Sequence, residues 1–159
     1  VEKLALYKLN DENPLTNQDI SNCIPISNES QIDEVLTVVL SGNHSKISQI
    51  VNRLRSQGVL PVTLLIAATR HFKILFSIAS NPKGPNSGAA ALRPPIYGPR
   101  KENLINQAQK WGPEKIKNAI KSITATNLQL RSQNQKLPQM ALVERLFIRL
   151  AMTLNNQID

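Results

Sequence analysis

Basic side chains dominate the stretch from residue 93 to residue 121, and the chemistry that suits them is the binding of anions. Only two acidic residues, Glu102 and Glu114, lie within this stretch. Cations on one exposed helix side can neutralise phosphates, and an aromatic side chain beside them can stack on an unpaired base. The alternative interpretation is a solvated basic surface that favours solubility. The candidate DNA-facing residues are Arg93, Tyr97, Arg100, Lys101, Lys110, Lys115, Lys117 and Lys121.

No group of residues in the sequence predicts a catalytic site, a metal site or a bound cofactor. His44 and His71 are far apart, and the single cysteine, Cys23, leaves a zinc ion too few ligands. We interpret His71 as a structural or surface side chain, because no nucleophile or paired acid accompanies it. The phosphate-binding pattern G-x-x-x-x-G-K-[ST] is absent, since Gly84-x-x-x-Gly88 lacks the lysine. A lone cysteine also rules out an internal disulfide and fits a reducing compartment.

The charges are distributed unevenly along the chain. Residues 1–44 contain two basic and seven acidic side chains, a net charge of −5. Residues 45–159 contain seventeen basic and four acidic side chains, a net charge of +13. Such asymmetry indicates that the second region faces a polyanion or an acidic partner, unless the charge serves only solubility.

The spacing of apolar residues predicts an all-α helical bundle that positions these side chains. The stretch from Pro61 to Ser80 is the central helix, because proline suits the first helical position and apolar residues cover one broad side behind it. Two further helices, at residues 31–40 and from residue 45, are joined by so short a turn that they must be antiparallel neighbours. The remaining predicted helices are at 1–7, 16–23, 101–111, from 113 and from 138.

The segment around Gly112-Pro113 is predicted to end one helix and start another. Trp111 lies in phase with Leu104 and Ala108, which favours a place in the core over a role in base stacking. Tyr97 has no helical phase, and its role stays open. Residues 81–99 contain five of the ten prolines, so we expect a long loop with one helical turn at most, at residues 89–92.

The sequence also bears on membranes and on domain organisation. No apolar run reaches the roughly 18 residues that span a bilayer, so we expect no membrane segment. Val1–Tyr7 lacks the basic leader and the cleavage site of a signal peptide. The chain opens within a helical pattern and without methionine, and we therefore expect a fragment of a longer protein that holds one domain plus part of another.

Several stretches together resemble the delta subunit of bacterial DNA polymerase III, the clamp-opening subunit of the replicative clamp loader. They are LRPPIYGPRK at 92–101, MALVERLFIRL at 140–150, ATRHF at 68–72 and EKLALY at 2–7. Each is weak alone, but they follow in the expected order over essentially the whole chain. The similarity is to the C-terminal half of that subunit, with a Pro- and Gly-rich insertion at 81–95 as the main departure.

This resemblance implies an architecture and a set of partners. Residues 1–26 would be the end of a small ATPase-like lid domain, and residues 27–159 a helical collar domain that oligomerises with the other clamp-loader subunits. The sliding-clamp contact would lie in an N-terminal domain that this chain lacks. The protein would be a cytoplasmic bacterial accessory subunit of the polymerase, without ATP hydrolysis or a catalytic site of its own. The candidate subunit-interface residues, on the last helix, are Leu142, Leu146, Phe147 and Leu150.

Two functional hypotheses follow from these observations. The first is a collar that associates with sister subunits during the loading of the sliding clamp onto primed DNA. The second is an autonomous nucleic-acid-binding helical domain that uses the basic region by itself. An enzyme is disfavoured because the sequence offers no site.

Overall fold

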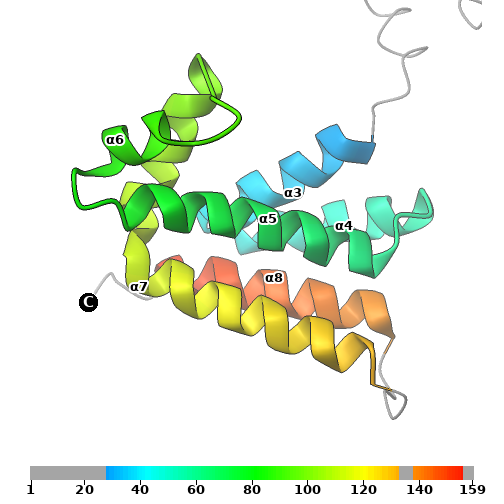
Figure 1. Cartoon of the computed structure of the whole chain (residues 1–159). Coiled ribbons are helices and arrows are strands. Elements are labelled where there is room, and N and C mark those ends of the chain that lie inside the picture. Colours follow the sequence, from blue (N-terminus) through cyan, green and yellow to red (C-terminus); the bar gives the residue numbers. More distant parts are fainter. Residues whose placement is uncertain (1–27, 133–137, 156–159) are drawn as a thin grey trace, which may run out of the picture.

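A computed structural model describes residues 28–132 and 138–155 of the chain, and this part forms a bundle of helices (Figure 1). The predicted all-α class is confirmed. The expected helices at 1–7 and 16–23 and the lid-domain fragment at 1–26 lie outside the described residues, so the domain boundary stays a prediction. The helices are α3 (Asn28–Ser41), η1 (His44–Lys46), α4 (Ile47–Ser56), α5 (Pro61–Ala79), α6 (Pro85–Ala90), α7 (Pro99–Leu130) and α8 (Gln139–Asn155).

Helix α5 lies at the centre of the bundle, as predicted. Pro61 occupies its first position, where a missing N–H costs no hydrogen bond. Its most extensive contact is with α7, and it also packs against α6 and α8. The buried side consists of Leu64, Leu65, Ala68, Phe72, Leu75 and Ile78.

By length and composition alone, α5 is apolar enough to cross a membrane, and it is the only described helix with this property. The expectation that no segment would be long and apolar enough to span a bilayer is therefore wrong for α5. Packing explains part of this composition, because α5 meets other helices on several sides, while an exposed edge of the helix is also apolar. Arg70 and Lys73 mark the side that faces water.

Helices α3 and α4 pack against each other across a short turn, as predicted. Gly42 makes the turn with a φ of 83°, a conformation that favours glycine. The same turn is held by α8, because the Asn155 side chain donates a hydrogen bond of 2.9 Å to the Gly42 carbonyl oxygen. A Cβ atom on Gly42 would lie 2.7 Å from the Asn155 Oδ1 atom, so a side chain there would displace the Asn155 amide group.

The segment between α5 and α7 is more ordered than its prolines suggested. It contains α6, six residues from Pro85 to Ala90, where at most one turn at 89–92 was expected. Gly88 allows this helix to approach α5 closely, since a Cβ atom there would lie 2.6 Å from the Ile78 carbonyl oxygen. The prediction failed because Pro85 opens a helix here instead of breaking one.

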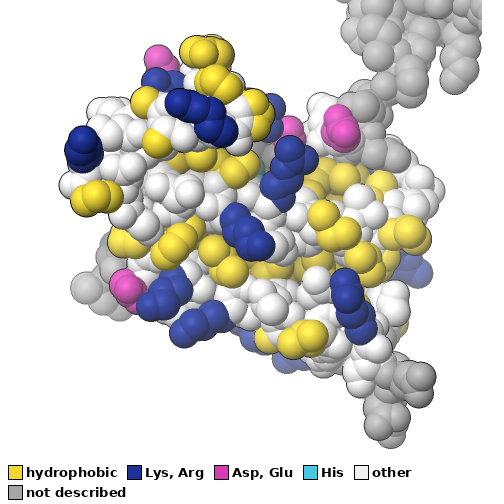
Figure 2. All heavy atoms as spheres, in the orientation of Figure 1, with side chains coloured by type: hydrophobic (Ala, Val, Ile, Leu, Met, Phe, Trp, Pro, Cys, Tyr) yellow, Lys and Arg dark blue, Asp and Glu magenta, His cyan; other side chains and the backbone are white. Residues whose placement is uncertain are grey.

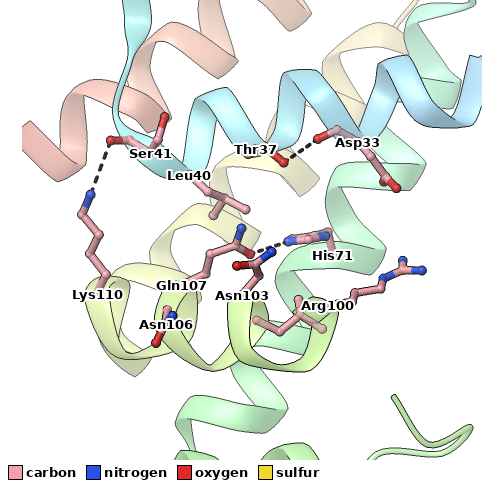
Figure 3. A pocket seen from close by; sticks show the side chains of 11 residues that line it. Asp33, Thr37, Leu40, Ser41, His71, Arg100, Asn103, Asn106, Gln107 and Lys110 are labelled. Carbon is pink, nitrogen blue, oxygen red and sulfur yellow. Dashed lines mark hydrogen bonds between the residues drawn. The ribbon is translucent and has the colours of Figure 1, made fainter. Parts of the chain in front are cut away.

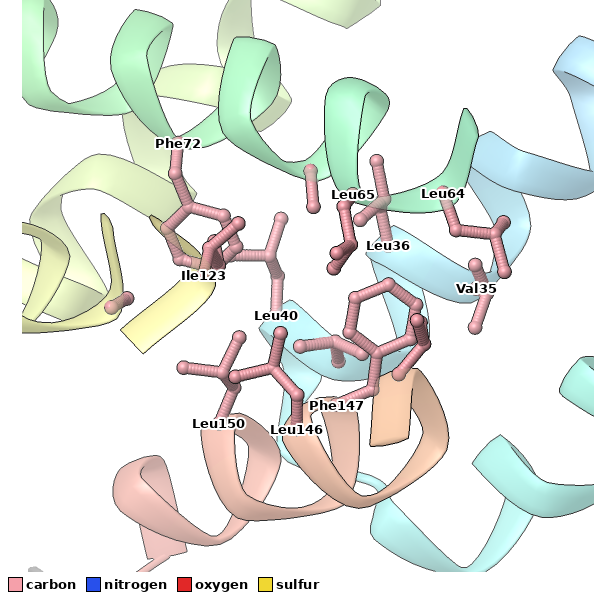
Figure 4. Close-up of a cluster of buried hydrophobic side chains, with 14 of the residues drawn as sticks. Val35, Leu36, Leu40, Leu64, Leu65, Phe72, Ile123, Leu146, Phe147 and Leu150 are labelled. Carbon is pink, nitrogen blue, oxygen red and sulfur yellow. The ribbon is translucent and has the colours of Figure 1, made fainter. Parts of the chain in front are cut away.

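The core fills the space between α3, α5, α7 and α8 (Figure 4). Phe147 and Phe72 are its largest fully buried side chains. The four residues predicted as a subunit interface point into this core, so that assignment is wrong for the chain as folded. Their apolar periodicity is explained by packing within the chain, where they cover α3, α4, α5 and α7. These buried residues are Leu142, Leu146, Phe147 and Leu150.

Candidate binding surfaces of the bundle

An open cleft of about 530 Å³ lies between α3 and the first part of α7, with α5 behind it (Figure 3). The two helices run in the same direction along its sides, from Asp33 to Ser41 on α3 and from Arg100 to Lys110 on α7. Most of the other lining side chains are polar and uncharged. They are Thr37, Asn103, Asn106 and Gln107, with His71 from α5 and the apolar Leu40 and Leu104.

His71 joins the back of the cleft to its α7 side. Its Nε2 atom lies 3.0 Å from the Gln107 Oε1 atom. A carbonyl oxygen can only accept, so the histidine nitrogen donates and the Gln107 amide group keeps its own N–H donors for the cleft. Burial lowers the pKa of His71, outweighing the Gln107 hydrogen bond and the Asp33 carboxylate, which raise it. The imidazole is therefore neutral at physiological pH, in agreement with the predicted structural role.

Trp111 follows the cleft-lining residue Lys110 on α7 and is buried in the core. Its indole nitrogen donates a hydrogen bond of 3.1 Å to the Leu40 carbonyl oxygen at the end of α3. Its ring also meets Phe72 of α5 edge to face, with a centroid distance of 5.3 Å. The predicted core position of Trp111 is confirmed. Beside it, the Lys110 ammonium group lies 3.4 Å from the Ser41 carbonyl oxygen, a weak contact at an exposed site.

The structure places the eight candidate DNA-facing residues in different surroundings. Arg100 and Lys110 line the cleft, whereas Lys117 and Lys121 are exposed on the later part of α7. The remaining four lie in different settings. Arg93 donates hydrogen bonds to the backbone oxygens of residues 90 and 92, Tyr97 is 78% exposed, and Lys101 and Lys115 are half-buried.

A smaller hollow of about 240 Å³ between the end of α7 and α8 was not predicted. Arg145 and Arg149, one helical turn apart on α8, line it together with Thr126 and Gln129 from α7. Two arginines on one turn can both reach a single phosphate or carboxylate group. The spacing of the two arginines was visible in the sequence, but their α7 neighbours depend on the tertiary structure.

Exposed apolar side chains cross the face that α5 presents to solvent, and Figure 2 shows them as a band interrupted by lysine and arginine. Leu60 is 66% exposed and Ile66 is 58% exposed. Sequence periodicity predicted one broad apolar side for α5 and could not show that the edge with Ile66 faces solvent. The apolar side of α5 is therefore wider than the part of the helix that the core covers.

Metal-ligand chemistry has no evident place in the part of the chain that the structure describes. No three histidine, cysteine or acidic side chains come together there in a metal-binding arrangement. The cleft beside His71 contains one acid, Asp33, and no sulfur ligand. What the surfaces offer is hydrogen bonding, positive charge and exposed apolar area, which suit binding.

The helical arrangement has a counterpart among solved structures. It is similar to the structure of the DNA clamp loader delta protein (YqeN) of Bacillus subtilis, with a TM-score of 0.72 over 95% of this chain. The identity is 17%, and the similar region covers 44% of the Bacillus chain, so this chain spans less than half its length. The resemblance predicted from the sequence is thus confirmed at the level of the fold. No protein-family model and no curated sequence matches the chain.

Proposed function

We propose that this chain is part of a clamp-loader delta subunit and that its bundle is the collar through which the subunit joins its sister subunits. The observation that carries the proposal is the similarity in fold to the Bacillus clamp loader delta protein over nearly the whole chain. In this role the bundle holds the subunit in its assembly while the sliding clamp is loaded onto primed DNA. The contact with the clamp itself belongs to another part of the subunit. We place the assembly in the bacterial cytoplasm, as an accessory of DNA polymerase III.

The exposed side of α5 is the surface that best fits such an association. Ile66 lies on this side and Leu60 directly precedes the helix, and both have most of their area in contact with water. Burying the exposed part of two such side chains against a partner contributes roughly 1 to 2 kcal/mol each, because each is already partly buried. Arg70 and Lys73, on the same side of the helix, provide a charged margin of the kind that surrounds protein interfaces.

The test is copurification of the full-length subunit with the other clamp-loader subunits of its source. Ile66→Glu combined with Leu60→Glu should abolish or strongly weaken association while the helical circular dichroism and the melting temperature stay close to wild type. Met152→Glu, an equivalent change at an exposed site on α8, is the matched control and should associate normally. Normal association of the double variant would move the interface away from α5. Failure of the wild-type subunit to join the assembly would refute the proposed function.

A second candidate function, nucleic-acid binding by the bundle itself, is supported by the paired arginines on α8 and the exposed lysines on α7. Arg145 and Arg149 make no ion pair within the described chain, and the same is true of Lys117 and Lys121. Binding to a single-stranded or double-stranded oligonucleotide that weakens steeply with salt would favour this function. Absence of binding at low salt would exclude it.

A further inference from the structure

We infer that the cleft between α3 and α7 is a binding site for an extended, acidic polypeptide segment of a partner protein. The inference relies on the proposed function only for the choice of partner, a neighbouring clamp-loader subunit. Three features of the cleft favour such an occupant: its length, the unused hydrogen-bonding groups along it and the placement of charge at its ends.

The length of the cleft suits a short stretch of extended chain. From Arg100 to Lys110 the α7 side advances by ten residues, about 15 Å at the rise of an α-helix. An extended polypeptide covers that distance in about five residues. A single small anion cannot contact both ends, because the two cations are too far apart to share it.

The α7 side of the cleft has free groups of the kind that pair with a peptide backbone. Asn103 has no side-chain hydrogen-bond partner among the residues that the structure describes, and it points toward Gln107 and His71 (Figure 3). A primary amide both donates and accepts, which matches the alternating N–H and C=O groups of an extended chain. The Gln107 amide adds further donors, because His71 occupies only its oxygen. Leu40 and Leu104 supply the apolar floor for one side chain.

The charges decide between a peptide and a nucleic acid. Asp33 lines the α3 side, and its carboxylate faces the end of the cleft where Arg100 lies. A polyanion with regularly spaced phosphates would have to pass this acid, which opposes it. At the other end Lys110 has only its long contact with Ser41. A peptide can match the charges at both ends if it has an acidic side chain near Lys110 and a hydrogen-bond donor or a basic group near Asp33.

The probe is a set of immobilised synthetic decapeptides that tile the other clamp-loader subunits of the same source, incubated with the purified full-length protein. We expect one or a few acidic tiles to bind, and replacement of their Asp or Glu by Asn or Gln to remove the signal. Asn103→Leu and Lys110→Ala should each weaken binding about tenfold, because each removes one hydrogen-bonding or charged contact. Asn118→Leu and Lys121→Ala, on the exposed outer side of α7, are the matched controls and should bind as wild type.

The outcomes separate the inference from the proposed function. Binding of no tile, or equal binding by the cleft and control variants, overturns the inference, whether or not the wild-type subunit copurifies with its partners. Displacement of the peptide by a single-stranded oligonucleotide in the wild type but not in the Lys110→Ala variant would identify nucleic acid as the occupant and also overturn it. Peptide binding without copurification would leave the cleft assigned and refute the collar role.

Discussion

Before Gly112, helix α7 lines an open cleft with amide and basic side chains, and after Gly112 the same helix buries an apolar stripe in the core. The later segment contributes Ile116, Ala119 and Ile123 to the centre of the bundle. The earlier segment also buries one side, through Leu104, Ala108 and Trp111, and keeps Asn103 in solvent on its cleft side. The candidate binding side chains therefore lie on the exposed side of the early segment, apart from the buried stripes of both segments. Changes to the buried residues should affect folding, and changes to the exposed cleft residues should affect what the cleft holds.

The sharpest test of this separation compares Ile123→Ala with Asn103→Ala. Ile123 is fully buried, so its truncation leaves a cavity and should lower the free energy of unfolding by about 2–5 kcal/mol. Asn103→Ala removes an exposed side chain and should change it by no more than about 0.5 kcal/mol. Urea unfolding followed by circular dichroism measures both. Comparable losses would show that the cleft side of the early segment is as important for folding as the buried stripe of the late one.

The kink itself is the second place where the two segments can be tested. Gly112 has a φ of 70° and a ψ of 159°, a region of backbone conformation that is essentially restricted to glycine. No neighbouring atom would meet a Cβ atom there, so the cost of Gly112→Ala is conformational and should be about 1–3 kcal/mol. Asn118→Ala, on the exposed side of the later segment, is the control and should be nearly neutral. An unchanged Gly112→Ala protein would mean that the angle between the segments is not fixed by this residue.

Much of this arrangement was predictable from the sequence, for reasons that lie in local physics. Gly112-Pro113 identified the kink because these two residues have strong conformational preferences of their own. The phase of Trp111 with Leu104 and Ala108 placed it in the core, since helical periodicity is set by the backbone. The hydrogen bond from Trp111 to Leu40 could not be predicted, because it joins residues 71 positions apart.

The interface prediction failed for a physical reason as well. An apolar stripe on a helix shows that one side is buried but not whether the partner is the same chain or another one. Phe147 and Leu146 therefore gave the same signal as interface residues would, and the structure shows that they are core residues. The cleft beside His71 was equally hidden, because Asp33, His71 and Gln107 are brought together only by the tertiary fold.

The basic side chains of the two segments should differ in their response to nucleic acid. Lys117 and Lys121 face solvent, so replacing both by Gln should weaken binding to a DNA oligonucleotide and reduce the salt dependence by about one unit of slope for each lost phosphate contact. Arg100→Gln with Lys110→Gln should change the slope little, because Asp33 already opposes phosphates in the cleft. Fluorescence anisotropy at several salt concentrations compares the two pairs. Equal losses would mean that the cleft also faces DNA.

The smallest expected effect is the pH dependence that His71 adds to the stability of the cleft. Burial lowers its pKa below the ordinary value of 6.5, and Arg100 acts in the same direction, while Gln107 and Asp33 oppose the shift. The unfolded chain therefore binds the proton more readily than the folded one. Stability is fully present above the unfolded pKa and is lost progressively as the pH falls from that value through the lower pKa of the folded state.

The variant His71→Gln removes this titration and should give a flatter stability profile than wild type below about pH 6.5. Unfolding curves at several pH values measure the profile, and the NMR shift of the His71 ring reports its pKa directly. Arg100→Gln should raise that pKa and Asp33→Asn should lower it further, because each removes one of the charges that act on the imidazole. A His71 ring that titrates at its ordinary value in the wild type would show that the cleft is too wet to desolvate it. In that case the back of the cleft would be as open to water as the side that α7 lines.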